Sequence, residues 1–224
     1  MPDKHGNGFP DIRAVILDYG QVLAGSPTKE EFGRLAGMFN IDIDSFCQLW
    51  ENSRGPYDRG DLTPQEYWLQ LAAQTNSVLD DEQIEILRQV EVEIWSYPYP
   101  HMLEWVRHLR RAGIKTGLLS NMPRDLAAHL RANCEWMDDF AFKTLSAEVR
   151  MIKPDLAIYE HTLRGIGTRA EQALFIDDRE ANVQAAQSLG MHAIRFESAM
   201  ALEDSLQKLG FNILPPVQHR GKRG

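Results

Sequence analysis

Several short apolar runs in this sequence end in polar residues that could do chemistry. Asp18 follows AVIL, Ser120 and Asn121 follow TGLL, and Asp177 and Asp178 follow LFI. Any one of these residues alone is typical of a turn or a helix N-cap. Their recurrence at the ends of apolar runs indicates a common site, because ligands bind beyond the carboxyl ends of the strands in an open parallel sheet.

Carboxylates and a lysine at one site favour phosphoryl transfer. Asp18, Asp177 and Asp178 would repel one another unless a hard cation lay between them, and oxygen ligands with room for water suit Mg²⁺. Lys153 lies just before Pro154 and another expected helix and could reach the same edge, where a lysine and a hydroxyl group suit the oxygens of a phosphate. A carboxylate nucleophile, a divalent metal and a phosphate-binding cation together make a phosphoryl-transfer site.

The elements that must position these residues alternate along the chain. The expected strands are residues 13–18, 114–120, 142–145, 173–177 and 192–196. The expected helices between the later strands are residues 101–112, 123–133, 154–165 and 180–190. This alternation predicts an α/β fold, a doubly wound parallel sheet covered by helices on both faces.

A long helical stretch follows the first expected strand. From Thr28 to Trp95, apolar residues recur every three or four positions, which predicts helices at 28–39, 42–52, 63–74 and 80–95. We therefore predict an α/β core and an inserted helical cap. The predicted boundaries are 11–25 and 97–213 for the core, 26–96 for the cap, and 1–10 and 214–224 for flexible termini.

Composition narrows the function classes. The chain has 224 residues and a formal net charge of -8, so it lacks the basic balance of a nucleic-acid binder. No apolar run approaches the roughly 20 residues needed to cross a bilayer, and the amino terminus has no apolar signal core. We expect a cytoplasmic monomer or homodimer with a small phosphorylated substrate and no nucleic-acid or membrane partner. Cys47 and Cys134 are expected to be reduced thiols.

Four motifs resemble those of the haloacid dehalogenase superfamily, in particular its members with a helical cap after the first strand. The motifs are VILDYGQVL, LLSNM, RMIKPDLAIY and FIDDREANVQAAQSLGM, in the order of that family and spanning about residues 12–196. The last two are the most specific, because a lysine-proline pair opening a helix and a paired acidic dipeptide followed by Asn182 occur together in few other folds. The resemblance implies a Rossmannoid core with an inserted cap.

The resemblance implies a reaction at Asp18. This residue matches the nucleophile that forms an aspartyl-phosphate. Ser120 and Asn121 match the motif whose hydroxyl and backbone N–H hold the transferring phosphoryl group, and Lys153 matches the lysine that neutralises it.

The resemblance also implies a Mg²⁺ site. Asp178 matches the direct metal ligand, and Asp177 would act through water or as a second ligand. The carboxylate of Asp18 and the backbone carbonyl of Gly20 would complete the protein's share of the coordination. Asn182 would orient these groups, as residues behind a metal site commonly do.

Gly20 departs from the common first motif, D-x-D-G-T or D-x-D-G-V. The second aspartate of that motif protonates the leaving oxygen and then activates the hydrolytic water, and glycine cannot move a proton. Some members of the family that resemble this chain also have glycine at this position. The change favours a good leaving group, such as an anomeric sugar phosphate, or another base supplied by the cap or by water held on Gln21.

Three functions stay open. We predict a Mg²⁺-dependent phosphatase that hydrolyses a small phosphorylated metabolite, with a sugar phosphate as one candidate, through an aspartyl-phosphate intermediate. The second function is a binding protein that keeps the fold and the metal site but has lost turnover because of Gly20. The third is a 2-haloacid dehalogenase, which needs neither metal nor phosphate binding. The acidic pair Asp177 and Asp178 argues against this third function.

Substrate choice is expected to lie in the cap. Residues 52–63 are expected to form a loop between two helices, because glycines and a proline in this segment are turn formers. Arg54, Tyr57 and Arg59 in this segment could face the site or could be solvent-exposed loop residues. Tyr19, next to the expected nucleophile, could face the substrate or pack beneath the cap.

Overall fold

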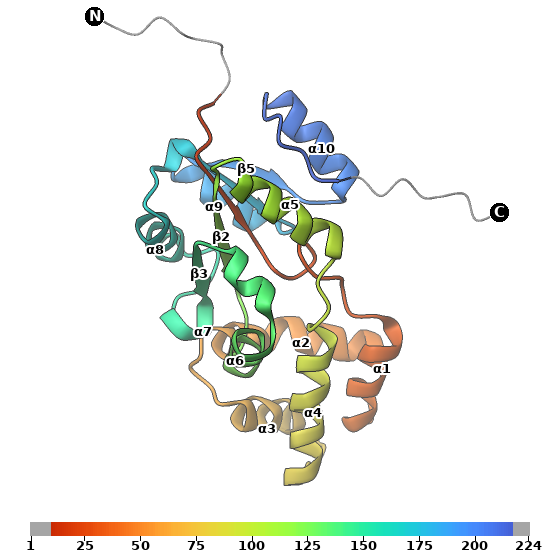
Figure 1. Ribbon diagram of the computed structural model, residues 1–224. Helices are drawn as coiled ribbons and strands as arrows, with labels where there is room; N and C mark the ends of the chain where they lie inside the picture. Colours follow the sequence, from red (N-terminus) through yellow and green to blue (C-terminus); the bar gives the residue numbers. More distant parts are fainter. Residues whose placement is uncertain (1–9, 217–224) are drawn as a thin grey trace, which may run out of the picture.

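The structure, a computed structural model, describes residues 10–216 and confirms the predicted doubly wound parallel sheet (Figure 1). The strand order is β3-β2-β1-β4-β5, and every pairing is parallel. The strands are β1 Ala14–Leu17, β2 Lys115–Ser120, β3 Phe142–Leu145, β4 Ala173–Asp177 and β5 His192–Arg195. From central β1 the chain runs outward through β2 to β3, then crosses to β4 on the other side of β1 and continues to β5, so the switch point of the topology lies between β1 and β4.

Helices cover both faces of the sheet (Figure 1). One face packs against α5 Pro100–Arg111, α6 Arg124–Asn133 and α10 Ala199–Lys208. The other packs against α8 Leu156–Ile166 and α9 Glu180–Ser188. The short segments η1 Glu135–Asp139, α7 Ser146–Val149 and η2 Ala170–Gln172 complete the core. Because β1 is buried on both sides, its sequence is a continuous apolar run rather than an alternating one.

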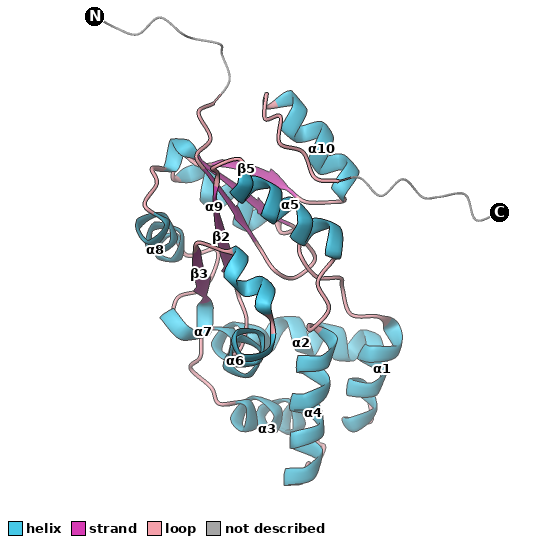
Figure 2. Cartoon of the chain, viewed as in Figure 1, coloured by secondary structure: helices cyan, strands magenta, loops and turns pink. Residues whose placement is uncertain are grey.

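The helices between β1 and α5 form a separate unit with its own hydrophobic cluster, and we call this unit the helical insertion (Figure 2). Its members are α1 Lys29–Met38, α2 Ile43–Asp58, α3 Pro64–Gln74 and α4 Asp81–Ile94. Reciprocal capping boxes begin α1, α3 and α4. The predicted cap lies at this place, and its division from the core at residues 26 and 96 stays a prediction.

The chain leaves and re-enters the core at adjacent points. Ala24, after β1, bridges to Pro98, before α5. The backbone N–H of Tyr99 donates to the carbonyl of Leu23 at 2.6 Å. The helical insertion is therefore closed at its base.

The prediction that residues 52–63 form a loop is wrong for residues 52–58, because α2 continues through Pro56 to Asp58. Tyr57 stacks on Tyr67 with 4.0 Å between ring centroids, and its hydroxyl donates to Glu91 at 3.0 Å. A proline inside a helix removes a backbone hydrogen bond. Here, contacts with α3 and α4 hold the last turn of α2 in place.

The ends of the chain lie largely outside the described residues. This applies to residues 1–9 and 217–224, most of the predicted flexible segments 1–10 and 214–224. Leu214, in the second segment, packs against the main core cluster. Within residues 10–216, no helix combines the length and apolar character needed to span a bilayer.

Candidate active site

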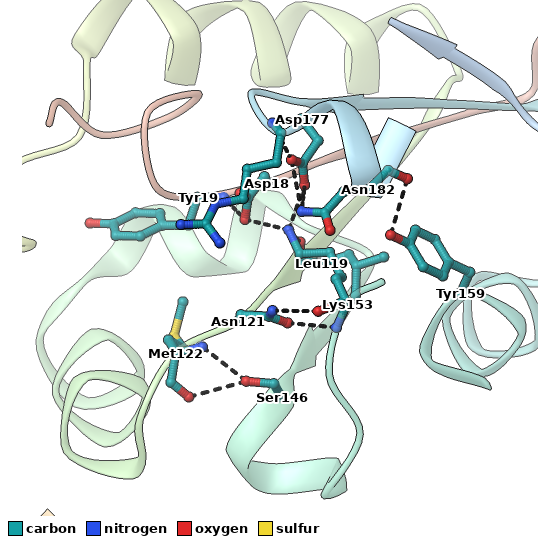
Figure 3. Close-up of polar contacts among 11 residues, drawn as sticks. Asp18, Tyr19, Leu119, Asn121, Met122, Ser146, Lys153, Tyr159, Asp177 and Asn182 are labelled. Atoms are coloured by element: carbon teal, nitrogen blue, oxygen red, sulfur yellow. Dashed lines mark hydrogen bonds and ion pairs between the residues drawn. The ribbon is translucent and has the colours of Figure 1, made fainter. Parts of the chain in front are cut away.

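The carboxyl ends of β1, β2 and β4 bring the predicted polar residues together (Figure 3). A cavity of about 320 Å³ opens above them, between the sheet and the helical insertion. The predicted residues in its wall are Asp18, Gly20, Ser120, Asn121, Lys153, Asp178 and Asn182. Asp177 lies behind this wall with no exposed surface. The strand ends thus assemble every predicted site residue at one place.

Lys153 is the centre of the polar network. Its Nζ lies 2.8 Å from Asp18 Oδ1 and 2.6 Å from Asp177 Oδ2, and donates to the carbonyl of Leu119 at 3.1 Å. These acceptors use all three donors of the ammonium group. Burial lowers the pKa of Lys153, but the charges of Asp177 and Asp18 outweigh burial and raise it above its ordinary value. A permanent cation therefore touches the expected nucleophile.

The side chain of Asn121 positions this lysine. Its Nδ2 donates to the carbonyl of Lys153 at 3.0 Å, and the backbone N–H of Lys153 donates to Asn121 Oδ1 at 2.9 Å. Both ends of the amide are thus occupied by the backbone of Lys153. The phosphate contact predicted here for a backbone N–H does not need this amide, and it stays a prediction.

Asp177 accepts hydrogen bonds on both oxygens. Asn182 Nδ2 donates to them at 2.9 and 3.0 Å, and the backbone N–H of Arg179 donates at 2.8 Å. Tyr159 in turn donates to the carbonyl of Asn182 at 3.1 Å (Figure 3). These contacts, with the pairing to Lys153, suit a supporting place for Asp177 behind Asp178.

An acidic cluster suits a metal ion. Asp18, Asp177 and Asp178 each offer an oxygen, and these atoms lie within 4.8 Å of one another. Burial raises the pKa of Asp18 to about 6. The pKa of Asp178 is also raised, mainly by burial and to a smaller extent by the negative charge of Asp177. A divalent cation among these groups would favour their charged forms. The donors are all oxygen atoms, as a hard cation requires.

The loop after β1 places Gly20 against Trp95. A β-carbon at position 20 would lie 3.4 Å from Cζ3 and 3.6 Å from Cη2 of the indole ring. The left-handed residue of this loop is Gln21, with φ 61°, so no positive φ requires glycine at position 20. Tyr19 stacks on Trp136 at 5.6 Å, and its hydroxyl donates to the carbonyl of Trp95. Tyr19 therefore packs beneath the insertion and anchors the end of α4.

One face of α2 forms the opposite wall of the cavity. Its lining residues recur every three or four positions, and they are Cys47, Trp50, Glu51, Arg54 and Asp58. Of these residues, only Arg54 was predicted as a candidate for the site, and the sequence predicted a loop where α2 continues to Asp58. The recurrence of these residues every three or four positions as far as residue 58 was the signal in the sequence that could have identified this wall. Arg59 lies outside this wall and pairs with Asp61 at 2.6 Å.

Arg54 is held within the insertion. Its Nη2 lies 2.7 Å from Asp58 Oδ1, its Nη1 pairs with Glu91, and its guanidinium lies 4.4 Å from the ring of Trp50. Burial lowers the pKa of Arg54, but the two carboxylates raise it well above the ordinary value. Arg54 is thus a permanent cation that two carboxylates already neutralise.

A buried lysine that pairs with a strand-end aspartate at the switch point of a doubly wound sheet is the arrangement expected of a hydrolase with an α/β fold. Within that class, the chain belongs to the haloacid dehalogenase-like hydrolases, because the model of that family matches residues 7–190. The resemblance found in the sequence motifs is thereby confirmed.

Known relatives agree with this family. The sesquiterpene phosphatase AstK of Aspergillus oryzae is 31% identical over 200 residues, which cover 88% of this chain and 96% of AstK. The structure of BT-2542, a haloacid dehalogenase (HAD) family enzyme of Bacteroides thetaiotaomicron, was solved in complex with magnesium and inorganic phosphate. It is 23% identical with a TM-score of 0.67, covering 83% of this chain and 94% of that one. The L-2-haloacid dehalogenase of Xanthobacter autotrophicus is 20% identical with a TM-score of 0.64, covering 88% of this chain and 83% of that one.

Proposed function

We propose that this hydrolase is a Mg²⁺-dependent phosphatase that cleaves the monoester of a small phosphorylated metabolite through an aspartyl-phosphate on Asp18. The observation that carries the proposal is the contact of Lys153 Nζ with Asp18 Oδ1 at 2.8 Å, beside the acidic cluster. A cation at this distance suits a phosphoryl group arriving at the carboxylate. The similarity to a sesquiterpene phosphatase supports the same reaction class. Sugar phosphates and other small esters are candidate substrates.

Each residue has a defined task in this reaction. A carboxylate oxygen of Asp18 attacks phosphorus, the P–O bond to the leaving group breaks, and the departing oxygen takes a proton from water to form the alcohol. Lys153 neutralises the phosphoryl oxygens, while the Ser120 hydroxyl and the Asn121 backbone N–H orient them. Asp18, Asp178 and the Gly20 carbonyl would hold Mg²⁺, which would offset the charge of the transferring group. Water then cleaves the acyl phosphate, which releases phosphate and restores Asp18.

The two other functions have distinct consequences. A binding protein without turnover would bind Mg²⁺ and phosphate but release no product. A 2-haloacid dehalogenase would act without metal, and the metal-suited cluster around Asp178 argues against this reaction; the likeness to the Xanthobacter enzyme is one of fold. The cytoplasmic location, the absence of a nucleic-acid partner and a monomeric or homodimeric state stay predictions from the sequence.

Metal dependence tests the proposal directly. Hydrolysis of p-nitrophenyl phosphate should require Mg²⁺ and stop on chelation. Asp178→Ala should weaken Mg²⁺ binding by about 10- to 100-fold or more, because it removes a ligand, while Ser120→Ala should leave binding almost unchanged. Calorimetric titration with Mg²⁺ measures both losses. Equal losses would contradict the assignment of Asp178, and product release from 2-chloropropionate in chelator would favour the dehalogenase.

Gly20→Asp should raise turnover on alkyl phosphates, whose leaving groups need a proton. The gain is expected to reach up to about 10²-fold, the low end of general acid–base catalysis. Gly20 has no positive φ, and its added β-carbon would meet Trp95 at ordinary contact distance, so the backbone accepts the substitution. Aryl phosphates, which leave without help, should gain less.

Gly20→Asn is the matched control, since it has the same shape without an ionisable proton. Steady-state rates on both ester classes, with circular dichroism to verify folding, separate the outcomes. Equal rates for a folded Gly20→Asp variant and the wild type would mean that another residue already supplies the proton.

A further inference from the structure

Three aromatic side chains line the part of the active-site cavity that the helical insertion forms. Phe32 of α1, Trp50 of α2 and Trp95 after α4 line it from the insertion. Met122 and Leu126, at the start of α6, add apolar surface from the core side. Phe32 and Trp95 are only half-buried, so part of each ring is open to a ligand. An apolar group bound above Asp18 would contact these side chains.

The cations around the cavity are already paired. Within residues 10–216, the lining cations are Lys153, Arg54 and Arg179. The first two each contact two carboxylates, and Arg179 Nη2 at the rim lies 3.8 Å from Glu51 Oε1. On the insertion side, the lining carboxylates are Glu51 and Asp58. Among the described lining residues, a second anionic group on a substrate would therefore find only Arg179, an exposed and loosely paired cation at the rim, to receive it.

The hydroxyl groups of a substrate would find few hydrogen-bond partners beside Phe32, Trp50 and Trp95. A sugar ring could stack its C–H face on the indole and phenyl rings, but its hydroxyl groups would lose hydrogen bonds to water that these rings do not replace. The Asn121 amide is occupied by Lys153, and Gln21 Oε1 already accepts a hydrogen bond from Ser26.

We propose that the leaving group is neutral and apolar, so that the natural substrate is an alkyl or alkenyl monophosphate with a single anionic group. The phosphate lies at Lys153 and the acidic cluster, and the hydrocarbon lies against Phe32, Trp50 and Trp95. The cavity of about 320 Å³ is at the small end of the range for ligand pockets, which suits a short chain. This inference rests on the proposed phosphatase function.

Calorimetric titration with phosphonates tests the preference without turnover, because their C–P bond is not hydrolysed. The full chain in saturating Mg²⁺ is titrated with octylphosphonate, propylphosphonate and phosphonoacetate, the last two being similar in size. A fully buried methylene contributes about fourfold in affinity. Octylphosphonate has five more methylenes than propylphosphonate, and burial of about two or three of them in this small cavity should make it bind about 10- to 100-fold more tightly. Phosphonoacetate should bind more weakly than propylphosphonate. Phosphonoacetate binding as tightly as octylphosphonate, or no dependence on chain length, would overturn the proposal.

A positive charge placed in the cavity wall should weaken the preference for the apolar ligand. Cys47→Lys adds a free cation on the cavity face of α2 and should shift the ratio of phosphonoacetate to octylphosphonate affinity by about tenfold or more toward phosphonoacetate. Gln48→Lys adds the same charge on the same helix at an exposed position outside the cavity and should not change the ratio. An equal shift in both variants would contradict the assignment of this wall. If Cys47→Lys fails to fold, the wild-type series alone decides.

Hydrolysis of p-nitrophenyl phosphate separates this inference from the proposed function. Failure of the phosphatase function would appear as no product release together with a retained preference for octylphosphonate. Failure of the present inference would appear as Mg²⁺-dependent product release with no such preference.

Discussion

Asp18→Asn is expected to lower kcat for p-nitrophenyl phosphate by about three orders of magnitude or more, the effect of removing a nucleophile in other hydrolases. The amide has the shape of the carboxylate but cannot form an acyl phosphate. The fold should persist, because Lys153 keeps its contact with Asp177 at 2.6 Å. Stopped-flow and steady-state product release measure the loss.

Circular dichroism and octylphosphonate binding serve as controls for Asp18→Asn, since a folded variant should retain its apolar wall. Activity above about a tenth of the wild-type rate would remove Asp18 from the mechanism, because a nucleophile contributes far more than tenfold.

Lys153→Met is expected to abolish activity and also to destabilise the protein. Lys153 is buried between two carboxylates, with a side chain 1% exposed, so its removal leaves Asp18 and Asp177 without their cation. Breaking a buried ion pair in this way costs about 3–5 kcal/mol of unfolding free energy. Urea denaturation without Mg²⁺ measures this loss. The loss should shrink as the pH falls, because the unpaired carboxyl groups then take up protons in the folded state.

Lys143→Met is the matched control. Among residues 10–216, Lys143 Nζ donates only to the carbonyls of Met137 and Phe140, each at 3.1 Å, and pairs with no carboxylate. Its replacement should cost much less unfolding free energy and should preserve activity. Equal destabilisation by the two substitutions would show that Lys153 acts as an ordinary packing residue.

The strand ends were predictable because their determinants are local. A buried parallel strand is a short apolar run, and the chain changes to polar residues where the strand leaves the sheet, as at Asp18 and Ser120. Because ligands bind at this edge of the sheet, residues far apart in the sequence can be predicted to lie close together without any knowledge of tertiary contacts. The same reasoning placed Asp178 and Lys153 in the site.

The cavity wall of the insertion was not predictable in the same way. The last turn of α2 depends on the pairing of Arg54 with Glu91, 37 positions away, and on the stacking of Tyr57 on Tyr67. Local propensity ends the helix before Pro56, and tertiary contacts reverse that outcome. The covering of Gly20 by Trp95 likewise joins two segments that no local pattern connects.

Because the helical insertion is closed at its base, changes in the insertion can occur independently of changes at the strand ends. Ala24 and Pro98 pair where the chain leaves and re-enters the core, so the residues between them form a unit that can be exchanged with little effect on the sheet. The groups assigned to phosphoryl transfer all lie outside that unit, whereas the aromatic and charged wall of α2 lies within it. Mutations between these two points can therefore change which ester is accepted while the strand ends keep the reaction the same. A family built on this plan can diversify its substrates by recombination of one continuous segment.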